Sequence, residues 1–189
     1  MKYPIVEVFT SIQGEGLYTG APANFIRLAG CNLSCDFCDT DKEAREDLSP
    51  KEIIEQLDPN VRLVVITGGE PTIHDLTELL KALGNGYRRH LETNGTNPLP
   101  GDIDFASVSP KPDADLTPYS RYSEAKWLIP EWSYEEIMWD IAEHHFLQPV
   151  NNKLTLDMDN VDWCVDLLKK HPRSDLRLSI QLHKIIGVR

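Results

Sequence analysis

The feature that most constrains the fold is a nearly continuous apolar run over residues 61–67, which leads directly into Gly68-Gly69-Glu70-Pro71. A strand that is apolar along its whole length is typical of a parallel sheet, because such a strand is covered on both faces. Strand-like and helix-like segments alternate along the chain without a linker, a repeat or a low-complexity run. This alternation predicts an α/β fold built on a parallel sheet.

The other predicted elements are short. Further strands are expected over residues 23–28, 90–93, 103–108, 125–129, 145–147 and 176–182. Helices are expected from the capping boxes at 49–52 and 133–136, to about residues 57 and 143, and over 73–83 and 159–170. A complete eightfold barrel takes about 250 residues. A chain of 189 residues therefore predicts an incomplete TIM-like (partial β/α) barrel with reduced helices, in a single domain over residues 1–189.

Charge and hydropathy exclude several classes of partner. The chain has 19 basic and 30 acidic residues, a net charge of −11, which argues against nucleic acid and against an anionic membrane surface. No stretch approaches the roughly 20 apolar residues that cross a bilayer, and the first residues lack the apolar run of a signal peptide. We therefore expect a cytoplasmic protein with no nucleic-acid and no membrane partner.

Three of the four cysteines lie close together. Cys31, Cys35 and Cys38 fall within eight residues, whereas Cys164 belongs to the apolar stripe of the last predicted helix. In a reducing cytoplasm, clustered cysteines more often bind metal or carry out redox chemistry than form disulfides. The spacing leaves two sites open: an iron–sulfur cluster with one iron free for a ligand, or a zinc site completed by a nearby aspartate or by Cys164.

Polar clusters follow the predicted strands at residues 68–70, 92–95, 109–111 and 148–149. In barrels of this class the loops at the carboxyl ends of the strands build the active site. The clusters therefore indicate an enzyme, although turn-forming residues also collect at strand ends in purely structural proteins.

The cysteine spacing C-x-x-x-C-x-x-C, followed by Gly-Gly-Glu-Pro at a strand end, resembles the radical S-adenosylmethionine (SAM) enzymes. Six further motifs are similar, in order, to the 7-carboxy-7-deazaguanine synthase family: Phe9-Thr10-Ser11-Ile12-Gln13-Gly14-Glu15-Gly16, Phe25-Ile26-Arg27-Leu28, Cys38-Asp39-Thr40, Glu92-Thr93-Asn94-Gly95, Ser109-Pro110-Lys111 and Gln181-x-His183-Lys184. The similarity covers nearly the whole chain and is weakest over about residues 113–145.

This resemblance implies a radical SAM carbon–nitrogen lyase with the fold of that superfamily. The reaction is the Mg²⁺-dependent ring contraction of 6-carboxy-5,6,7,8-tetrahydropterin to 7-carboxy-7-deazaguanine, with release of ammonia, in queuosine and deazapurine biosynthesis. The implied cofactors are a [4Fe–4S] cluster, SAM and Mg²⁺, and the implied partners are a second copy in a homodimer and an electron donor such as flavodoxin. The rival interpretations are another radical SAM enzyme, such as a glycyl-radical activase, and a non-enzymatic zinc-binding adaptor.

The resemblance also assigns the cofactor residues. Cys31, Cys35 and Cys38 hold the cluster that cleaves SAM, and Thr40 supplies an oxygen to Mg²⁺. The residues assigned to SAM are Phe37, Asp39, Gly68, Gly69, Glu70, Asn94, Gly95, Ser109, Lys111, Gln148, Pro149, Val150 and Asn151.

The substrate residues implied by the resemblance are Ile12, Gln13, Gly14, Glu15, Arg27, Thr93, His183 and the chain end at Arg189. Glu15 can accept hydrogen bonds from the guanidine-like nitrogens of a pterin. Arg27 is expected to hold the substrate carboxylate, because guanidinium pairs bidentately with carboxylates. A charge without a partner inside the apolar strand around Arg27 would be costly.

Overall fold

The computed structural model describes residues 1–112, 114–116, 121–152 and 154–188. The chain divides into two compact units, each assembled from segments that are distant in the sequence. The first unit consists of Met1–Ser11, Pro22–Thr93 and Asn97–Ala106, and the second of Ile12–Ala21, Asn94–Thr96 and Ser107–Arg189. The single radical SAM domain over residues 1–189 stays a prediction.

The sheet of the first unit has the strand order β3-β1-β2-β4-β5. Its strands are β1 (Tyr3–Ile12), β2 (Pro22–Leu28), β3 (Glu46–Leu48), β4 (Leu63–Gly68) and β5 (Arg88–Thr93). β2, β4 and β5 run parallel, whereas β3 runs antiparallel to β1 at the edge. The apolar run predicted as a strand is β4, and it is buried over Leu63–Thr67 between two parallel neighbours, as its composition predicts.

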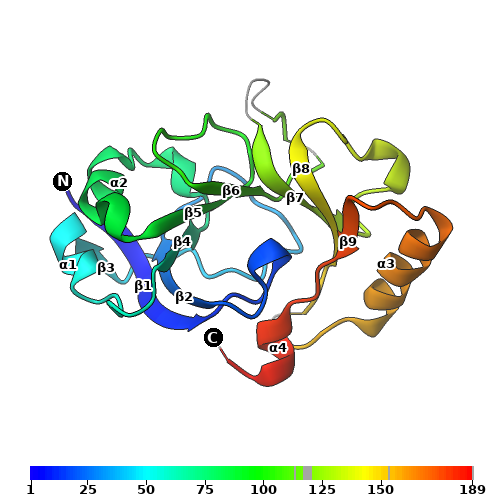
Figure 1. The fold of residues 1–189 in the computed structure, drawn as a ribbon, viewed down its shortest axis with the longest axis horizontal. Helices are drawn as coiled ribbons and strands as arrows, with labels where there is room; N and C mark the ends of the chain where they lie inside the picture. Colours follow the sequence, from blue (N-terminus) through cyan, green and yellow to red (C-terminus); the bar gives the residue numbers. More distant parts are fainter. Residues whose placement is uncertain (113, 117–120, 153, 189) are drawn as a thin grey trace. The chain divides into compact units, whose positions relative to one another are not determined.

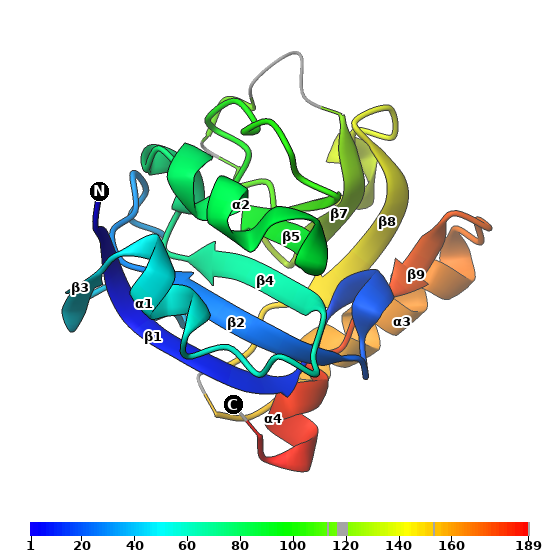
Figure 2. The ribbon, with the colours of Figure 1, turned by 60° about the vertical axis from the view of Figure 1, so that its left-hand side comes forward.

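Two short helices cover this sheet. Figure 2 shows α1 (Pro50–Ile54) and α2 (Thr77–Leu83) lying in front of β1, β2 and β4. Apolar residues of both helices share one core with the strands, for example Ile53 and Leu79 with Ile26 and Ile66. The capping box at Ser49 is formed as predicted, so α1 begins where the sequence indicates.

The second unit is also a parallel sheet. β6 (Phe105–Val108), through its last two residues, pairs with β7 (Tyr122–Ile129), and β8 (Ala142–Pro149) and β9 (Leu176–Leu178) follow. α3 (Met158–Lys170) packs beside β8 and β9 (Figure 1). Asp157 caps its first turn, and Cys164 is completely buried on its inner face, as the apolar stripe predicts.

Besides α1, which was expected to reach about residue 57 but ends at Ile54, three predicted elements differ clearly from the structure. The helix expected over residues 73–83 is a 3₁₀ turn, η2 (Pro71–Ile73), followed by α2, which begins only at Thr77. The capping box of Ser133 and Glu136 forms, but it closes a single 3₁₀ turn, η4 (Tyr134–Glu136), so the helix predicted to residue 143 is wrong. β8 begins at Ala142 because that segment pairs with β7 at Tyr122.

The third difference lies at the end of the chain. The strand predicted over residues 176–182 is shorter, because β9 ends at Leu178 and the helix α4 (Leu182–Ile186) follows. The sequence analysis also did not predict β1, β3 or two further 3₁₀ turns, η1 (Gly16–Tyr18) and η3 (Gly84–Gly86). Within the described part of the chain, no helix has the length and apolar character needed to span a membrane.

Candidate functional site

The loop with the three cysteines leaves the carboxyl end of β2. Its ends are joined by a hydrogen bond from the Gly30 amide to the Lys42 carbonyl, 3.0 Å. Inside the loop the Cys38 amide donates to the Cys35 carbonyl, 3.2 Å, and the Leu33 amide donates to the Cys31 sulfur, 3.4 Å. All three cysteines are free thiols and half-buried. Amide hydrogen bonds to sulfur are one of the means by which a protein tunes the potential of an iron–sulfur cluster.

The three free thiols on one short loop are the donor set that an iron–sulfur cluster takes. Over the described residues, no three His, Cys, Asp or Glu side chains are gathered closely enough to hold one metal ion. In a [4Fe–4S] cluster each of three thiolates binds an iron of its own, which leaves the fourth iron open to a ligand.

The Gly-Gly-Glu segment at the end of β4 is joined to the start of the cysteine loop. The Gly69 amide donates to the Leu28 carbonyl, 3.2 Å, and the Glu70 amide to the Gly30 carbonyl, 2.9 Å. A Cβ on residue 69 would collide with the Gly30 carbonyl oxygen, so only glycine allows this approach. Direct backbone contacts therefore join the two segments to which the resemblance assigns the cluster and part of SAM.

Glu70 is the most enclosed of the predicted SAM residues, with no exposed surface. Its Oε1 accepts hydrogen bonds from the Thr72 amide, 3.0 Å, the Thr72 hydroxyl, 2.5 Å, and the Thr93 hydroxyl, 2.7 Å. Thr93, predicted to face the substrate, thus also orients the carboxylate predicted to bind SAM. Three donors on one oxygen fix the side chain in place before any ligand binds.

Arg27 has a carboxylate partner within the first unit. Its Nε donates to Oε1 of Glu7 at 3.0 Å, and both side chains are partly exposed. This bond uses one of the five N–H donors of the guanidinium. Thr40 and Phe37 are half-buried on the cysteine loop, and the Thr40 carbonyl lies 3.9 Å from the Cys38 sulfur. Asp39, also predicted to contact SAM, is half-buried beside them.

In the second unit, the backbone of the segment that follows Ile12 is hydrogen-bonded to α4, to the residue after β9 and to β7. The Leu182 amide donates to the Gly14 carbonyl, 2.9 Å, the Gly16 amide to the Ser179 hydroxyl, 3.1 Å, and the Leu17 amide to Oε2 of Glu124, 2.8 Å. The predicted substrate residues Gly14 and His183 are direct neighbours, because a Cβ at residue 14 would overlap the His183 ring nitrogen Nδ1.

The side chain of Glu15 is the electrostatic centre of this segment. Lys126 of β7 places Nζ 2.6 Å from Oε2, and Gln181 donates from Nε2 to Oε1 at 2.7 Å. Burial by itself raises the pKa of the Glu15 carboxyl. The charge and hydrogen bond of Lys126 outweigh that effect, with smaller contributions from Gln181 and His183, and hold the pKa well below its usual range. Glu15 is therefore ionised and acts only as an acceptor.

The predicted SAM residues of the second unit fall into two groups. Near β6, the Lys111 ammonium donates to the Ser109 carbonyl at 2.6 Å, and Asn94 Oδ1 accepts from the Thr96 amide and hydroxyl at 3.0 and 2.7 Å. Gly95 is buried beside Asn94.

The second group lies at the end of β8. Gln148 accepts from the Ser179 hydroxyl, 2.9 Å, and Asn151 donates to Gln181, 3.0 Å, so both belong to the network around Glu15. Pro149 ends the strand, and the Val150 amide donates to the Ile129 carbonyl. Arg189, the predicted chain-end contact, lies outside the described residues.

Four residues that hold the predicted residues in place received no role from the sequence: Lys126, Gln181, Glu124 and Glu7. Gln181 stood in one of the family motifs, and a signal was also present for two of the others. Glu124 and Lys126 are charged residues two apart in an apolar segment, and they are 1% and 3% exposed. A charge inside an apolar strand is costly without a partner, and this cost, which singled out Arg27, applies equally to Glu124 and Lys126.

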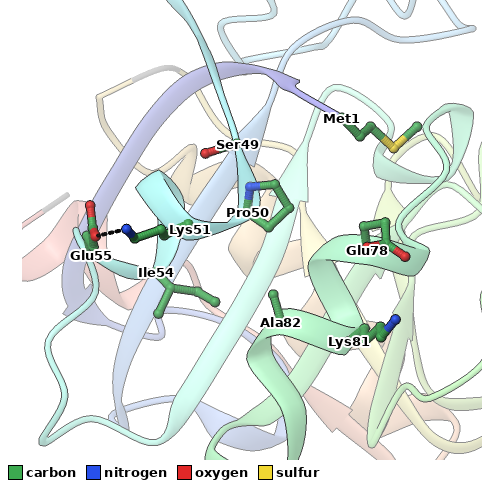
Figure 3. A pocket seen from close by; sticks show the side chains of 9 residues that line it. All are labelled: Met1, Ser49, Pro50, Lys51, Ile54, Glu55, Glu78, Lys81 and Ala82. Atoms are coloured by element: carbon green, nitrogen blue, oxygen red, sulfur yellow. Dashed lines mark ion pairs between the residues drawn. The ribbon is translucent and has the colours of Figure 1, made fainter.

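The first unit also carries a surface hollow of about 670 Å³. It is lined mainly by α1 and α2, and the side chains in Figure 3 include the surface ion pair of Lys51 with Glu55, 3.7 Å. None of the predicted site residues lines it, so the hollow is not part of the candidate site.

Comparison with known proteins identifies the family. The family model "Radical SAM superfamily" matches residues 25–138. The chain is 41% identical to the 7-carboxy-7-deazaguanine synthase of Bacteroides thetaiotaomicron, over all of both chains. It is 37% identical to the synthase of Synechocystis sp., over all of this chain and 95% of that one. The crystal structure of QueE from Escherichia coli superposes with a TM-score of 0.76 at 28% identity, over 97% of this chain and 95% of that one.

These findings confirm the predicted fold class, an incomplete TIM-like barrel of the radical SAM type with reduced helices. They also confirm that the protein is a radical SAM enzyme, for which the superfamily implies SAM and a [4Fe–4S] cluster. Full-length similarity to two synthases sets aside the zinc-binding adaptor and the glycyl-radical activase. The chain belongs to the 7-carboxy-7-deazaguanine synthase family of radical SAM enzymes.

Proposed function

We propose that this enzyme contracts the ring of 6-carboxy-5,6,7,8-tetrahydropterin to give 7-carboxy-7-deazaguanine and ammonia. The observation that carries the proposal is the direct attachment of the Gly-Gly-Glu segment to the cysteine loop, through the Glu70–Gly30 backbone bond. It attaches the segment that carries an ordered carboxylate to the start of the cysteine loop, which supports a site for an amino acid ligand of the cluster such as the methionyl part of SAM.

On the cofactor side, Cys31, Cys35 and Cys38 hold the cluster, and Glu70 accepts from the ammonium of SAM. When bound, the cluster supplies one electron and SAM supplies the carbon radical that starts the reaction. Phe37 and Asp39 contact SAM from the cysteine loop, and Gly68 and Gly69 contact it from the end of β4. The remaining SAM residues are Asn94, Gly95, Ser109, Lys111, Gln148, Pro149, Val150 and Asn151.

On the substrate side, Glu15 accepts hydrogen bonds from the amino edge of the pterin. Its ionised state supports this role, because a carboxylate offers about four acceptor positions and Lys126 and Gln181 occupy two. Arg27 binds the substrate carboxylate with the guanidinium donors that Glu7 does not use. Ile12, Gln13, Gly14, Thr93, His183 and the chain end at Arg189 complete the substrate contacts.

Mg²⁺ binds through Thr40, with substrate and water oxygens completing its shell, since magnesium prefers oxygen ligands and keeps several waters. We further propose that the enzyme works in the cytoplasm as a homodimer and receives its electron from a donor such as flavodoxin.

The test is an anaerobic assay of reconstituted enzyme with 6-carboxytetrahydropterin, SAM, Mg²⁺ and a reductant, analysed by mass spectrometry. We expect 7-carboxy-7-deazaguanine and ammonia in equal amounts from the wild type and neither from Cys35→Ala. A tetrahydropterin without the carboxylate serves as the matched control and should be converted poorly. Cleavage of SAM without any deazapurine product would overturn the proposed substrate.

A further inference from the structure

Lys126 lies in the middle of β7, and its side chain is only 4% exposed. Its Nζ is 2.6 Å from Oε2 of Glu15, a residue 111 positions earlier in the sequence. A buried lysine is stable in its charged form only beside a compensating group. The burial and the short distance together show that this ion pair is a built feature of the second unit.

The backbone around Glu15 does not depend on Lys126. It is fixed by the Leu182–Gly14, Gly16–Ser179 and Leu17–Glu124 hydrogen bonds, none of which involves the lysine. Gln181 holds the other carboxylate oxygen and is itself held by Asn151 at 3.0 Å. Removal of the lysine therefore changes the charge next to Glu15 more than the position of the chain.

The protonation of Glu15 decides what the segment can recognise. An ionised carboxylate only accepts hydrogen bonds. A protonated carboxyl also carries an O–H donor, which cannot pair with a ligand edge made of N–H donors. Among the described residues, the other titratable groups with a recorded interaction with this segment are Glu124 on β7 and His183 on α4. A carboxyl such as Glu124 cannot offset the negative charge of Glu15, and His183 contributes less than Lys126, so Lys126 is the principal group that keeps Glu15 in its acceptor form.

We propose that Lys126 is a positioning residue for substrate recognition, which holds Glu15 ionised and aimed so that the site selects a ring edge with adjacent N–H donors. The proposal rests on the proposed function, because it takes the pterin edge as the ligand of Glu15. Lys126 itself does not need to touch the substrate.

The experiment measures the anaerobic binding of 6-carboxytetrahydropterin by equilibrium dialysis, without reductant, between pH 6 and pH 9. The variants are Lys126→Met, the double variant Glu15→Gln with Lys126→Met, and the control Lys169→Met. Lys169 also pairs with a carboxylate, Asp166 at 3.7 Å, but on the exposed face of α3. The double variant leaves no unpaired buried charge and is expected to fold.

We expect Lys126→Met to weaken binding by about tenfold or more near pH 7, and to recover part of the affinity as the pH rises and Glu15 ionises. The double variant should bind weakly but with the pH dependence of the wild type, and Lys169→Met should match the wild type throughout. Because His183 is present in every variant, a difference in pH profile between the single and double variants reports the ionisation of Glu15. Equal binding by Lys126→Met and wild type, or the same pH profile for the single and double variants, would overturn the proposal.

Thermal unfolding of the same variants separates this inference from the proposed function. Burial is the largest influence on Glu15, so we expect that without Lys126 its pKa lies above the unfolded value; the stability it contributes is then greatest at low pH and is lost as the pH rises. The unfolding midpoint of Lys126→Met should fall between pH 6 and pH 9 relative to the double variant. If the wild type fails to bind the pterin but this difference is present, the substrate is wrong and the role of Lys126 stands. Parallel curves would refute the role of Lys126 whatever the substrate.

Discussion

Replacement of Arg27 by lysine tests the predicted carboxylate clamp. Arg27 is fixed through its Nε by Glu7, 3.0 Å away, so that its terminal nitrogens are available to form a planar fork. Lysine keeps the charge but replaces two parallel hydrogen bonds to a carboxylate by one. A hydrogen bond to a charged group contributes about 1.5–3 kcal/mol. At about 1.4 kcal/mol for each factor of ten, Arg27→Lys should lower kcat/KM for the pterin by about 10-fold to 150-fold.

The assay compares steady-state turnover and SAM binding of Arg27→Lys with those of Arg89→Lys. Arg89 is a matched control from the same unit, because it pairs bidentately with Asp104, at 2.9 and 3.0 Å, and has no predicted role in the site. The dissociation constant of SAM should stay within about twofold in both variants. The clamp would be refuted if Arg27→Lys affected SAM and pterin equally, or if it lost no more activity than Arg89→Lys.

Three further predictions concern the metal, the fourth cysteine and a buried histidine. Turnover is measured in a magnesium titration of chelated buffer. Thr40→Ala should keep normal iron content yet lose most of its magnesium-stimulated turnover, whereas Thr40→Ser should retain a large share. If Thr40→Ala responds to magnesium as the wild type does, Thr40 is excluded as a ligand. Cys164→Ala should leave iron content and activity nearly unchanged, because burial raises the pKa of the Cys164 thiol to about 12 and keeps it neutral. Loss of the cluster in this variant would contradict the three-cysteine assignment. His145 accepts a hydrogen bond from Trp127 at 3.1 Å, and burial lowers the pKa of His145 below the usual value of about 6.5. The stability that neutral His145 contributes is therefore complete above about pH 6.5 and is lost as the pH falls through the lowered pKa. The unfolding midpoint of the wild type should therefore drop more steeply from pH 7.5 to 5.5 than that of His145→Gln, and parallel curves would count against this explanation.

Local signals in the sequence predicted the parts of the fold that depend on neighbouring residues. The fully apolar β4 and the amphipathic α3 were found because burial on two faces and an apolar stripe at helical spacing leave marks within a few residues. The capping box at Ser133 was equally clear, yet only one turn followed it. Pairing of β8 with β7 overrode the local preference, and such pairing is not visible in a single segment.

The candidate site likewise has a part that local sequence patterns predicted and a part that they did not. The cysteine loop and Gly-Gly-Glu follow each other along the sequence and could be predicted from spacing, and the structure joins them through Glu70 and Gly30. Lys126 and Gln181 reach Glu15 across 111 and 166 residues. No local pattern connects residues so far apart, although the charge of Lys126 within a strand marked it as a residue that needed a partner.

We expect Cys31, Cys35 and Cys38 to hold a cluster with one iron open to SAM. The most direct measurement is the electron paramagnetic resonance spectrum of the anaerobically reconstituted, reduced enzyme, recorded with and without SAM. We expect about four irons per chain and a [4Fe–4S] signal that changes shape when SAM is added. A colourless protein that contains zinc, or a cluster signal that is the same with and without SAM, would contradict it.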